Sequence, residues 1–182
     1  MLVTSAQTLP LGERAPHFAL PNYQDAQHAG EVVSLSVAPA TVVMFLCNHC
    51  PYVLHIRASL IQLARLYMAR GVQFIAINAN DVERYPQDHP QHMLLQGYPF
   101  PYLWDADQVI AKAYHAVCTP DIFVFDAKWR GYYYGRFDGS TPGSDVPVSG
   151  ADLAHALDNL LRGEYPYPQP ALPSIGCSIK WL

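Results

Sequence analysis

Two cysteines, Cys47 and Cys50, lie between an apolar segment and a segment with helical spacing. Residues 41–53 read TVVMFLCNHCPYV, so a strand would deliver both thiols to the start of a helix. Unpaired backbone N–H groups and the helix dipole stabilise a thiolate at such a helix N-terminus. The pattern therefore indicates thiol–disulfide chemistry.

Pro51 indicates which thiol acts first. The residue before a proline is kept out of the α region, and proline is favoured at the first helical position. Cys50 should therefore be the N-cap, because a helix beginning at Cys47 would place Pro51 one turn inside it and remove a backbone hydrogen bond. We expect Cys50 to be the nucleophile with the lower pKa, about 3.5 to 7.5, and Cys47 to be the resolving thiol. A protonated His49 would lower the pKa of Cys50 further.

The second informative stretch is Cys118-Thr119-Pro120, which precedes an apolar strand. A cis proline at this position would present the backbone of Thr119 to an extended substrate, whereas a trans proline would simply begin the strand. Cys118 and Cys177 are candidates for secondary or resolving thiols. They could equally be inert, because free cysteine behaves as a small hydrophobic residue.

A metal site is the main alternative use of the cysteine pair. Structural zinc needs four ligands, typically in two pairs, and the second set could come only from isolated cysteines and scattered histidines. We therefore expect neither a metal ion nor a cofactor. A metal-binding or metallochaperone module built on Cys47, His49 and Cys50 remains an alternative.

The bulk properties favour one domain over residues 1–182. The chain is 51% hydrophobic and only 14% charged, with 15 acidic and 11 basic residues. It has no like-charged block, so we expect neither a nucleic-acid nor a membrane partner. The first twenty residues lack a basic start and an apolar core, and no apolar run approaches the roughly 18 residues of a membrane span. We expect a cytoplasmic protein, where structural disulfides are rare.

The apolar periodicity predicts a β-α-β unit, with strands over 40–46 and 72–77 joined by a helix over 51–70. We expect a loosely attached arm over 1–15 and a Pro-rich tail over 164–182 that packs as a strap. The remaining predicted elements are an N-terminal hairpin (17–20 with 31–37), helices near 90–96 and 107–114, a second hairpin (121–125 with 132–137) and a last helix that begins near 149 and ends before 163. This order predicts an α/β, thioredoxin-like fold: a central mixed β-sheet flanked by helices, with an N-terminal β-hairpin extension and a C-terminal strap.

Several motifs carry a family resemblance, namely FLCNHCPYV, NANDVERYP, VCTPDIFVFD, GRFDGSTPG and PSIGCSIKW. From about Leu11 onward the sequence resembles the peroxiredoxin-like, AhpC/TSA-related group of the thioredoxin superfamily. The resemblance implies a thioredoxin fold, a redox pair at Cys47 and Cys50, and a cis Pro120 beside it. Residues 50–53 also resemble the glutaredoxin Cys-Pro-Tyr-Cys motif, which places Cys50 at the nucleophile position.

Two features of related proteins are missing. Peroxiredoxins carry a Pro-x-x-x-Thr-x-x-Cys pattern, but counting back from Cys50 the threonine position holds Cys47 and the proline position holds Val43. Thioredoxin's buried acid is also absent, so Asp81 or water would have to accept the proton of the resolving thiol. We therefore expect a thiol–disulfide oxidoreductase, with an antioxidant thiol peroxidase as the alternative. Its partners would be a protein or small-molecule disulfide or thiol, and a reductant such as a thioredoxin or glutathione system.

Overall fold

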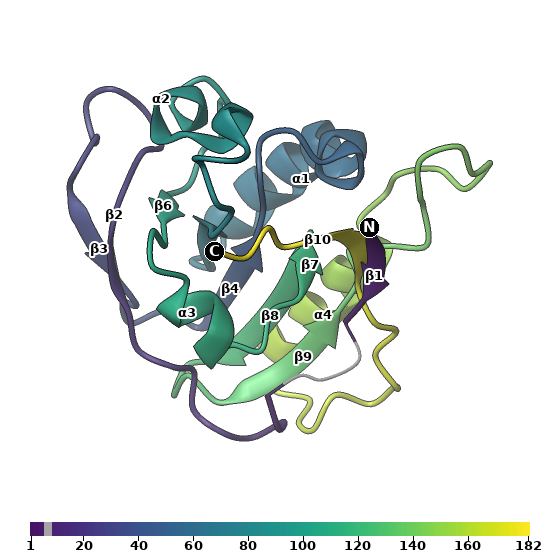
Figure 1. The fold of residues 1–182 in the computed structure, drawn as a ribbon. Coiled ribbons are helices and arrows are strands. Elements are labelled where there is room, and N and C mark those ends of the chain that lie inside the picture. The colour runs from purple at the N-terminus through teal and green to yellow at the C-terminus, as the bar shows by residue number, and fades with distance from the viewer. Residues whose placement is uncertain (6–8) are drawn as a thin grey trace.

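A five-stranded mixed sheet forms the centre of the molecule in a computed structural model of residues 1–182, of which 1–5 and 9–182 are described (Figure 1). The strand order is β6-β5-β4-β8-β9. Strands β4, β5 and β6 are parallel, whereas β8 is antiparallel to both β4 and β9. The bounds are β4 (Ala40–Phe45), β5 (Gln73–Asn78), β6 (Tyr102–Trp104), β8 (Asp121–Asp126) and β9 (Gly131–Gly135). The predicted mixed sheet is confirmed.

Strand β4 is buried on both faces, as its continuous apolar sequence predicts. Val42 and Met44 point into one hydrophobic cluster, while Val43 and Phe45 point into a second cluster on the opposite face. Strand β4 ends at Phe45, two residues before Cys47. Its packing therefore fixes where the chain leaves the sheet and enters the loop of the cysteine pair.

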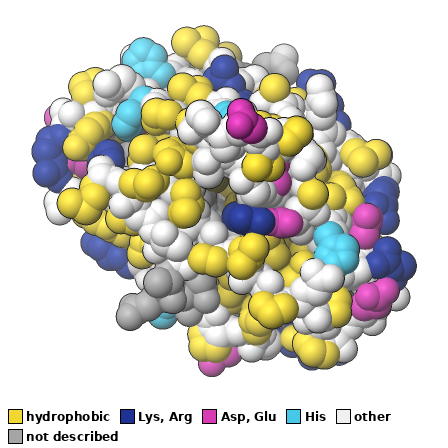
Figure 2. Space-filling model, turned by 90° about the vertical axis from the view of Figure 1, so that its right-hand side faces the viewer, with side chains coloured by type: hydrophobic (Ala, Val, Ile, Leu, Met, Phe, Trp, Pro, Cys, Tyr) yellow, Lys and Arg dark blue, Asp and Glu magenta, His cyan; other side chains and the backbone are white. Residues whose placement is uncertain are grey.

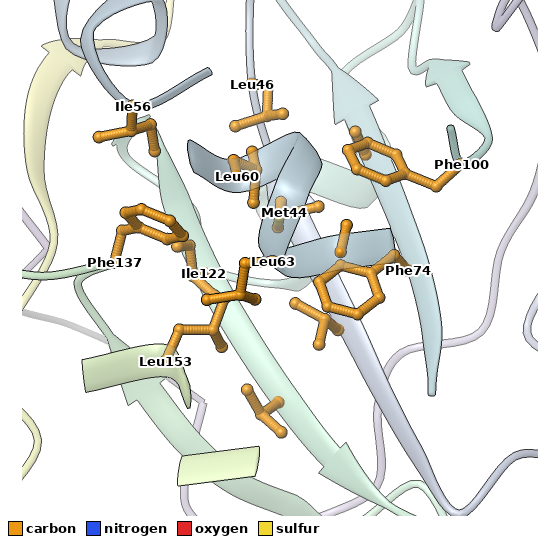
Figure 3. Close-up of a cluster of buried hydrophobic side chains, with 14 of the residues drawn as sticks. Met44, Leu46, Ile56, Leu60, Leu63, Phe74, Phe100, Ile122, Phe137 and Leu153 are labelled. Atoms are coloured by element: carbon orange, nitrogen blue, oxygen red, sulfur yellow. The ribbon is translucent and has the colours of Figure 1, made fainter. Parts of the chain in front are cut away.

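Helices α1 (Pro51–Met68) and α4 (Ala151–Leu161) cover one face of the sheet, and α3 (Val109–Ala113) lies on the other (Figure 1). Helix α1 presents Ile56, Leu60 and Leu63 to the first cluster (Figure 3). Truncating a fully buried leucine such as Leu60 to alanine would cost about 2–5 kcal/mol. This packing holds the helix N-terminus at the end of β4.

Short elements before β4 and after β5 lie outside the central sheet. The predicted N-terminal hairpin is confirmed as β2 (Ala19–Pro21) paired with β3 (Val32–Ser34). A 3₁₀ turn (Pro86–Asp88) and α2 (Pro90–Met93) follow β5, and α2 is shorter than the helix predicted over 90–96.

Among the described residues, no helix has the length and apolar content needed to cross a membrane.

A second, three-stranded sheet joins the two ends of the chain. Its order is β1 (Leu2–Thr4), β10 (Ile175–Ser178) and β7 (Cys118–Thr119), and both pairings are antiparallel. Residues 2–4 of the predicted arm are therefore attached by strand pairing rather than loosely, and the strap contains a strand that the sequence does not predict. Backbone hydrogen bonds define both strands, and so short a ladder leaves no apolar period in the sequence. Figure 2 shows basic and acidic side chains interspersed among hydrophobic ones on the face where β1 lies.

Candidate active site

Cys50 is the N-cap of α1, as Pro51 predicts. Its backbone is extended (φ −65°, ψ 123°), Pro51 is the first helical residue, and the Leu54 N–H donates to the Cys50 carbonyl oxygen at 2.9 Å. No acidic side chain lies in the first turn of α1. The free N–H groups of this turn therefore face the Cys50 thiol without a competing carboxylate.

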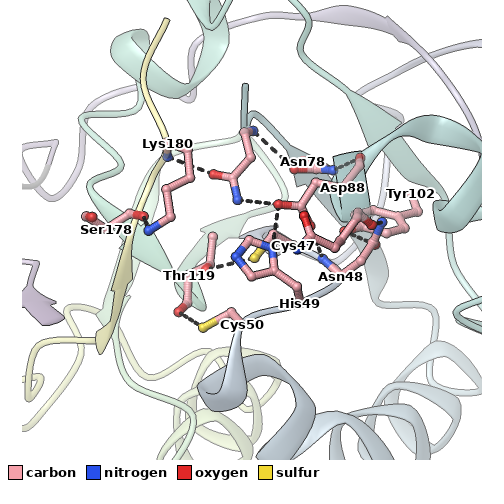
Figure 4. A network of polar contacts seen from close by, with 12 residues as sticks. Cys47, Asn48, His49, Cys50, Asn78, Asp88, Tyr102, Thr119, Ser178 and Lys180 are labelled. Atoms are coloured by element: carbon pink, nitrogen blue, oxygen red, sulfur yellow. Dashed lines mark hydrogen bonds and ion pairs between the residues drawn. The ribbon is translucent and has the colours of Figure 1, made fainter. Parts of the chain in front are cut away.

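Both thiols of the pair meet Thr119, which lies on β7 (Figure 4). The Cys50 thiol donates to the Thr119 carbonyl oxygen at 3.1 Å, and the Cys47 sulfur lies 3.3 Å from the Thr119 hydroxyl. The Thr119–Pro120 peptide bond is cis, as the family resemblance implies. Cys47 and Cys50 are 2% and 0% exposed. The structure thus brings together Cys47, Cys50, Pro51, Thr119 and Pro120, but it buries the two sulfurs.

The two thiols have opposite electrostatic surroundings. A hydrogen bond from the Cys47 thiol is the largest cause that lowers the pKa of Cys50, to about 4; hydrogen bonds from Thr119 and the Val53 N–H act in the same direction against burial. The pKa of Cys47 is raised well above its usual value by the same hydrogen bond to Cys50, by burial and by the charge of Asp88. Cys50 is therefore the thiolate of the pair, and Cys47 keeps its proton.

Asp88 is a buried carboxylate beside Cys47 that the sequence reasoning missed (Figure 4). Its Oδ1 accepts from the Asn48 N–H at 2.8 Å, and its Oδ2 accepts from the Asn80 side-chain amide at 2.7 Å. His49 Nδ1 also lies 2.7 Å from Oδ2. These donors compensate the cost of burying a charge, which would otherwise be large.

Asp81, the acid suggested by the sequence, lies elsewhere in the hydrogen-bond network. Its carboxylate pairs with the Arg84 guanidinium, which is the largest cause that lowers the pKa of Asp81. Both acids follow β5, with Asp81 close to the end of the strand and Asp88 in the 3₁₀ turn that comes next. The sequence could not indicate which acid turns inward, since the 3₁₀ turn that carries Asp88 decides this.

His49 lies on the Cys47 side of the site. Its ring stacks on Tyr85, with ring centroids 5.8 Å apart and planes 8° apart. One ligand atom each from Cys47, His49 and Asp88 lie within 4.8 Å of one another, which is a spacing that could hold a metal ion. The pKa of Cys50 is lowered mainly by hydrogen bonds from Cys47 and Thr119. The predicted effect of His49 is not among the largest causes.

The two remaining cysteines differ in position. Cys118 is buried on β7, its thiol donates to the Pro120 carbonyl oxygen at 3.5 Å, and burial raises its pKa. Cys177 is half-buried on β10, opposite Thr119, whose carbonyl oxygen lies 3.1 Å from the Cys50 sulfur. Burial, followed by the interaction with Cys50, raises the pKa of Cys177 to about 11. Only the second of these thiols contacts the pair.

A pocket of about 70 Å³ opens beside the first turn of α1. Tyr52, Pro120, Arg136 and Ile175 are among the residues that line it. The pocket therefore joins the helix that carries Cys50 to the strap that covers it.

A profile of the AhpC/TSA family matches residues 11–130, which is more than half of the chain. The chain belongs to the AhpC/TSA family. The chain is 49% identical to an uncharacterized conserved protein of Geobacillus kaustophilus, with a TM-score of 0.92 over 100% of this chain and 97% of that one. A hypothetical protein of Sinorhizobium meliloti 1021 is 40% identical, with a TM-score of 0.90 over 97% of each chain.

More distant structures show the fold alone. AhpC of Mycobacterium tuberculosis is 17% identical, with a TM-score of 0.61 over 87% of this chain and 97% of that one. A thiol:disulfide interchange protein of Chlorobium tepidum TLS is 20% identical, with a TM-score of 0.60 over 86% and 99%. The predicted thioredoxin-like fold is therefore confirmed. Comparison with curated proteins gave no match.

Proposed function

We propose that this protein is a thiol–disulfide oxidoreductase in which Cys50 is the nucleophile and Cys47 the resolving thiol. The Cys50 thiolate attacks a disulfide sulfur of the substrate, forms a mixed disulfide and releases the other half as a thiolate. Cys47 then attacks Cys50, which forms the Cys47–Cys50 disulfide and releases the reduced substrate. The observation that supports this most strongly is the position of Cys50 at the N-cap of α1, with the sulfurs of Cys47 and Cys50 both next to Thr119.

Resolution requires that Cys47 lose its proton. Asp88 and His49 each offer an atom within 4.8 Å of the Cys47 sulfur, a separation that one bridging water can span. We assign Asp88 the role of proton acceptor, with the His49 ring nitrogen 2.7 Å from its carboxylate as the neighbouring polar group. The substrate would be a protein or small-molecule disulfide, and a thioredoxin or glutathione system in the cytoplasm would reduce the enzyme.

Trapping tests the order of the two thiols. Because Cys177 also contacts Cys50, the test is made in a Cys177→Ser background. With glutathione disulfide, Cys47→Ser should accumulate a mixed disulfide at Cys50, detected by intact mass and peptide mapping. The matched Cys50→Ser variant should remain unmodified. A stable adduct on Cys47 in that variant would return the role of nucleophile to Cys47.

A thiol peroxidase is the second candidate, because the chain belongs to the AhpC/TSA family. In peroxiredoxins a threonine that helps bind peroxide stands three residues before the reactive cysteine, and here Cys47 stands there. We therefore expect hydrogen peroxide to be consumed no faster than by a free thiolate that has no peroxide-binding site. A rate far above that of free cysteine, abolished by Cys50→Ser, would favour the peroxidase.

The spacing of Cys47, His49 and Asp88 supports a metal-binding module as a third candidate. To test this function, the reduced protein is loaded with zinc and then dialysed against zinc-free buffer. Stoichiometric zinc that survives dialysis and disappears in Asp88→Ala, without disulfide reductase activity, would favour this function over the first.

A further inference from the structure

Cys50 has two thiol neighbours, and one of them comes from the C-terminal strap (residues 164–182). Strand β10 lies antiparallel to β7, with Cys177 opposite Thr119. The carbonyl oxygen of Thr119 lies 3.1 Å from the Cys50 sulfur, so this pairing brings Cys177 beside Cys50. Cys50 is therefore in contact with Cys47 from its own loop and with Cys177 from the other end of the chain.

The strap lies where an extended peptide would bind. Peptides commonly bind by adding a strand to an existing strand edge through backbone hydrogen bonds, and β10 adds to β7 in this way. A Cβ atom at Gly176 would lie only 2.0 Å from the Thr119 carbonyl oxygen, so the approach of the strap requires glycine. Cys177 thus occupies the place that the cysteine of a bound disulfide peptide would take beside Cys50.

Exposure differs among the three thiols. Cys50 is fully buried, whereas Cys177 is half-buried. A reagent that approaches from solvent therefore meets Cys177 before it meets Cys50. Direct attack on Cys50 by an external protein would first require the strap to leave Thr119.

We propose that Cys177 is a third redox thiol, which exchanges with the Cys47–Cys50 pair and carries the disulfide to the protein surface. The proposal rests on the proposed function, because the Cys47–Cys50 disulfide is its source. The Cys177 thiolate attacks the Cys50 sulfur, the Cys47–Cys50 bond breaks and the Cys50–Cys177 bond forms. Cys47 leaves as a thiolate and takes up one proton, which balances the proton lost by Cys177, so the exchange requires no external oxidant.

The new disulfide is poised to react with an external dithiol, protein or small molecule. A thiolate of that dithiol attacks the Cys177 sulfur and expels the Cys50 thiolate, and its second thiol then releases Cys177. Cys50 is a good leaving group because its pKa is about 4 and thiols of lower pKa leave faster. The external partner is oxidised by two electrons and the protein is reduced by two.

Glutathione disulfide tests the proposal in full-length variants. In Cys47→Ser, Cys177 should attack the Cys50–glutathione adduct and form an internal Cys50–Cys177 disulfide, identified by peptide mapping without reduction. The adduct should live at least about tenfold shorter than in Cys47→Ser/Cys177→Ser, where no resolving thiol remains. Cys118→Ala in the Cys47→Ser background is the matched control and should change nothing.

The outcomes separate the two proposals. If the double variant forms no adduct at Cys50, the proposed function fails and this inference fails with it. If the adduct forms but lives equally long with and without Cys177, only the inference fails. Should Cys47→Ser not fold, wild-type protein treated with glutathione disulfide and quenched in acid serves instead. It should contain some Cys50–Cys177 disulfide, and Cys47–Cys50 alone would overturn the inference.

Discussion

The two thiol neighbours of Cys50 lie in very different surroundings. Cys47 is buried beside the Asp88 carboxylate, and its pKa is raised by its interaction with Cys50, by burial and by the charge of Asp88. Cys177 is half-buried on a strand, and the charge of Lys180 lowers its pKa against the larger effect of burial. The surroundings of Cys47 therefore suit holding and transferring a proton, whereas those of Cys177 leave its thiol accessible to a partner from solvent.

Among the variants that test the contrast between Cys47 and Cys177, Asp88→Asn should have the largest effect. Without the carboxylate as a base, resolution of the Cys50 mixed disulfide by Cys47 should slow by about 10²-fold, the lower end for general base catalysis. The measurement is the lifetime of the Cys50–glutathione adduct in a Cys177→Ser background. Asp81→Asn is the matched control, because that acid pairs with Arg84. Equal slowing in both variants would contradict a specific role for Asp88.

The pH dependence of alkylation should sharpen the contrast between the two thiols. Because the pKa of Cys50 is about 4, its reaction with iodoacetamide should be flat from pH 8 to about pH 5. Below about pH 4 the rate should fall about tenfold per pH unit as the thiolate is protonated. Cys47→Ala should move the midpoint to higher pH, because it removes the largest cause of the low pKa. An unchanged midpoint would show that the helix N-terminus alone lowers the pKa.

The reduction potential of the Cys47–Cys50 couple should reflect the stabilised thiolate. Stabilising Cys50 as a thiolate favours the reduced form, so the potential should lie above the roughly −270 mV of thioredoxin. Equilibration with glutathione redox buffers measures it, again in the Cys177→Ser background. A value at or below that of thioredoxin would mean that the Cys50 thiolate does not shift the couple toward its reduced form.

The smallest effect is expected from Gly176→Ala on the Cys177 side. The added methyl group would clash with the Thr119 carbonyl oxygen, so the strap should shift at a cost of about 1–3 kcal/mol, as overpacking does. Cys50 should then react a few-fold faster with a bulky maleimide, while its alkylation by small iodoacetamide keeps the same pH midpoint. An unchanged maleimide rate would mean that the strap does not limit access. Chemical denaturation provides the stability measurement.

The strand-to-helix junction could be predicted in detail from sequence. Pro51 constrains the conformation of the residue before it and of the helix that follows, so its effect on Cys50 is local. The continuous apolar run of β4 likewise predicted burial on both faces. The strap could not be predicted in this way, because β10 pairs with residues that lie more than fifty positions away.

The sequence alone was thus enough to place Cys50 at the N-cap of a helix, because proline restricts its own backbone angle whatever the tertiary fold. Only the tertiary structure decided what surrounds that thiol. Asp88 reaches Cys47 through a turn after the neighbouring parallel strand, and Cys177 reaches Cys50 because the strap pairs with β7. Both contacts depend on how distant segments of the chain pack against one another, which local residue patterns do not specify.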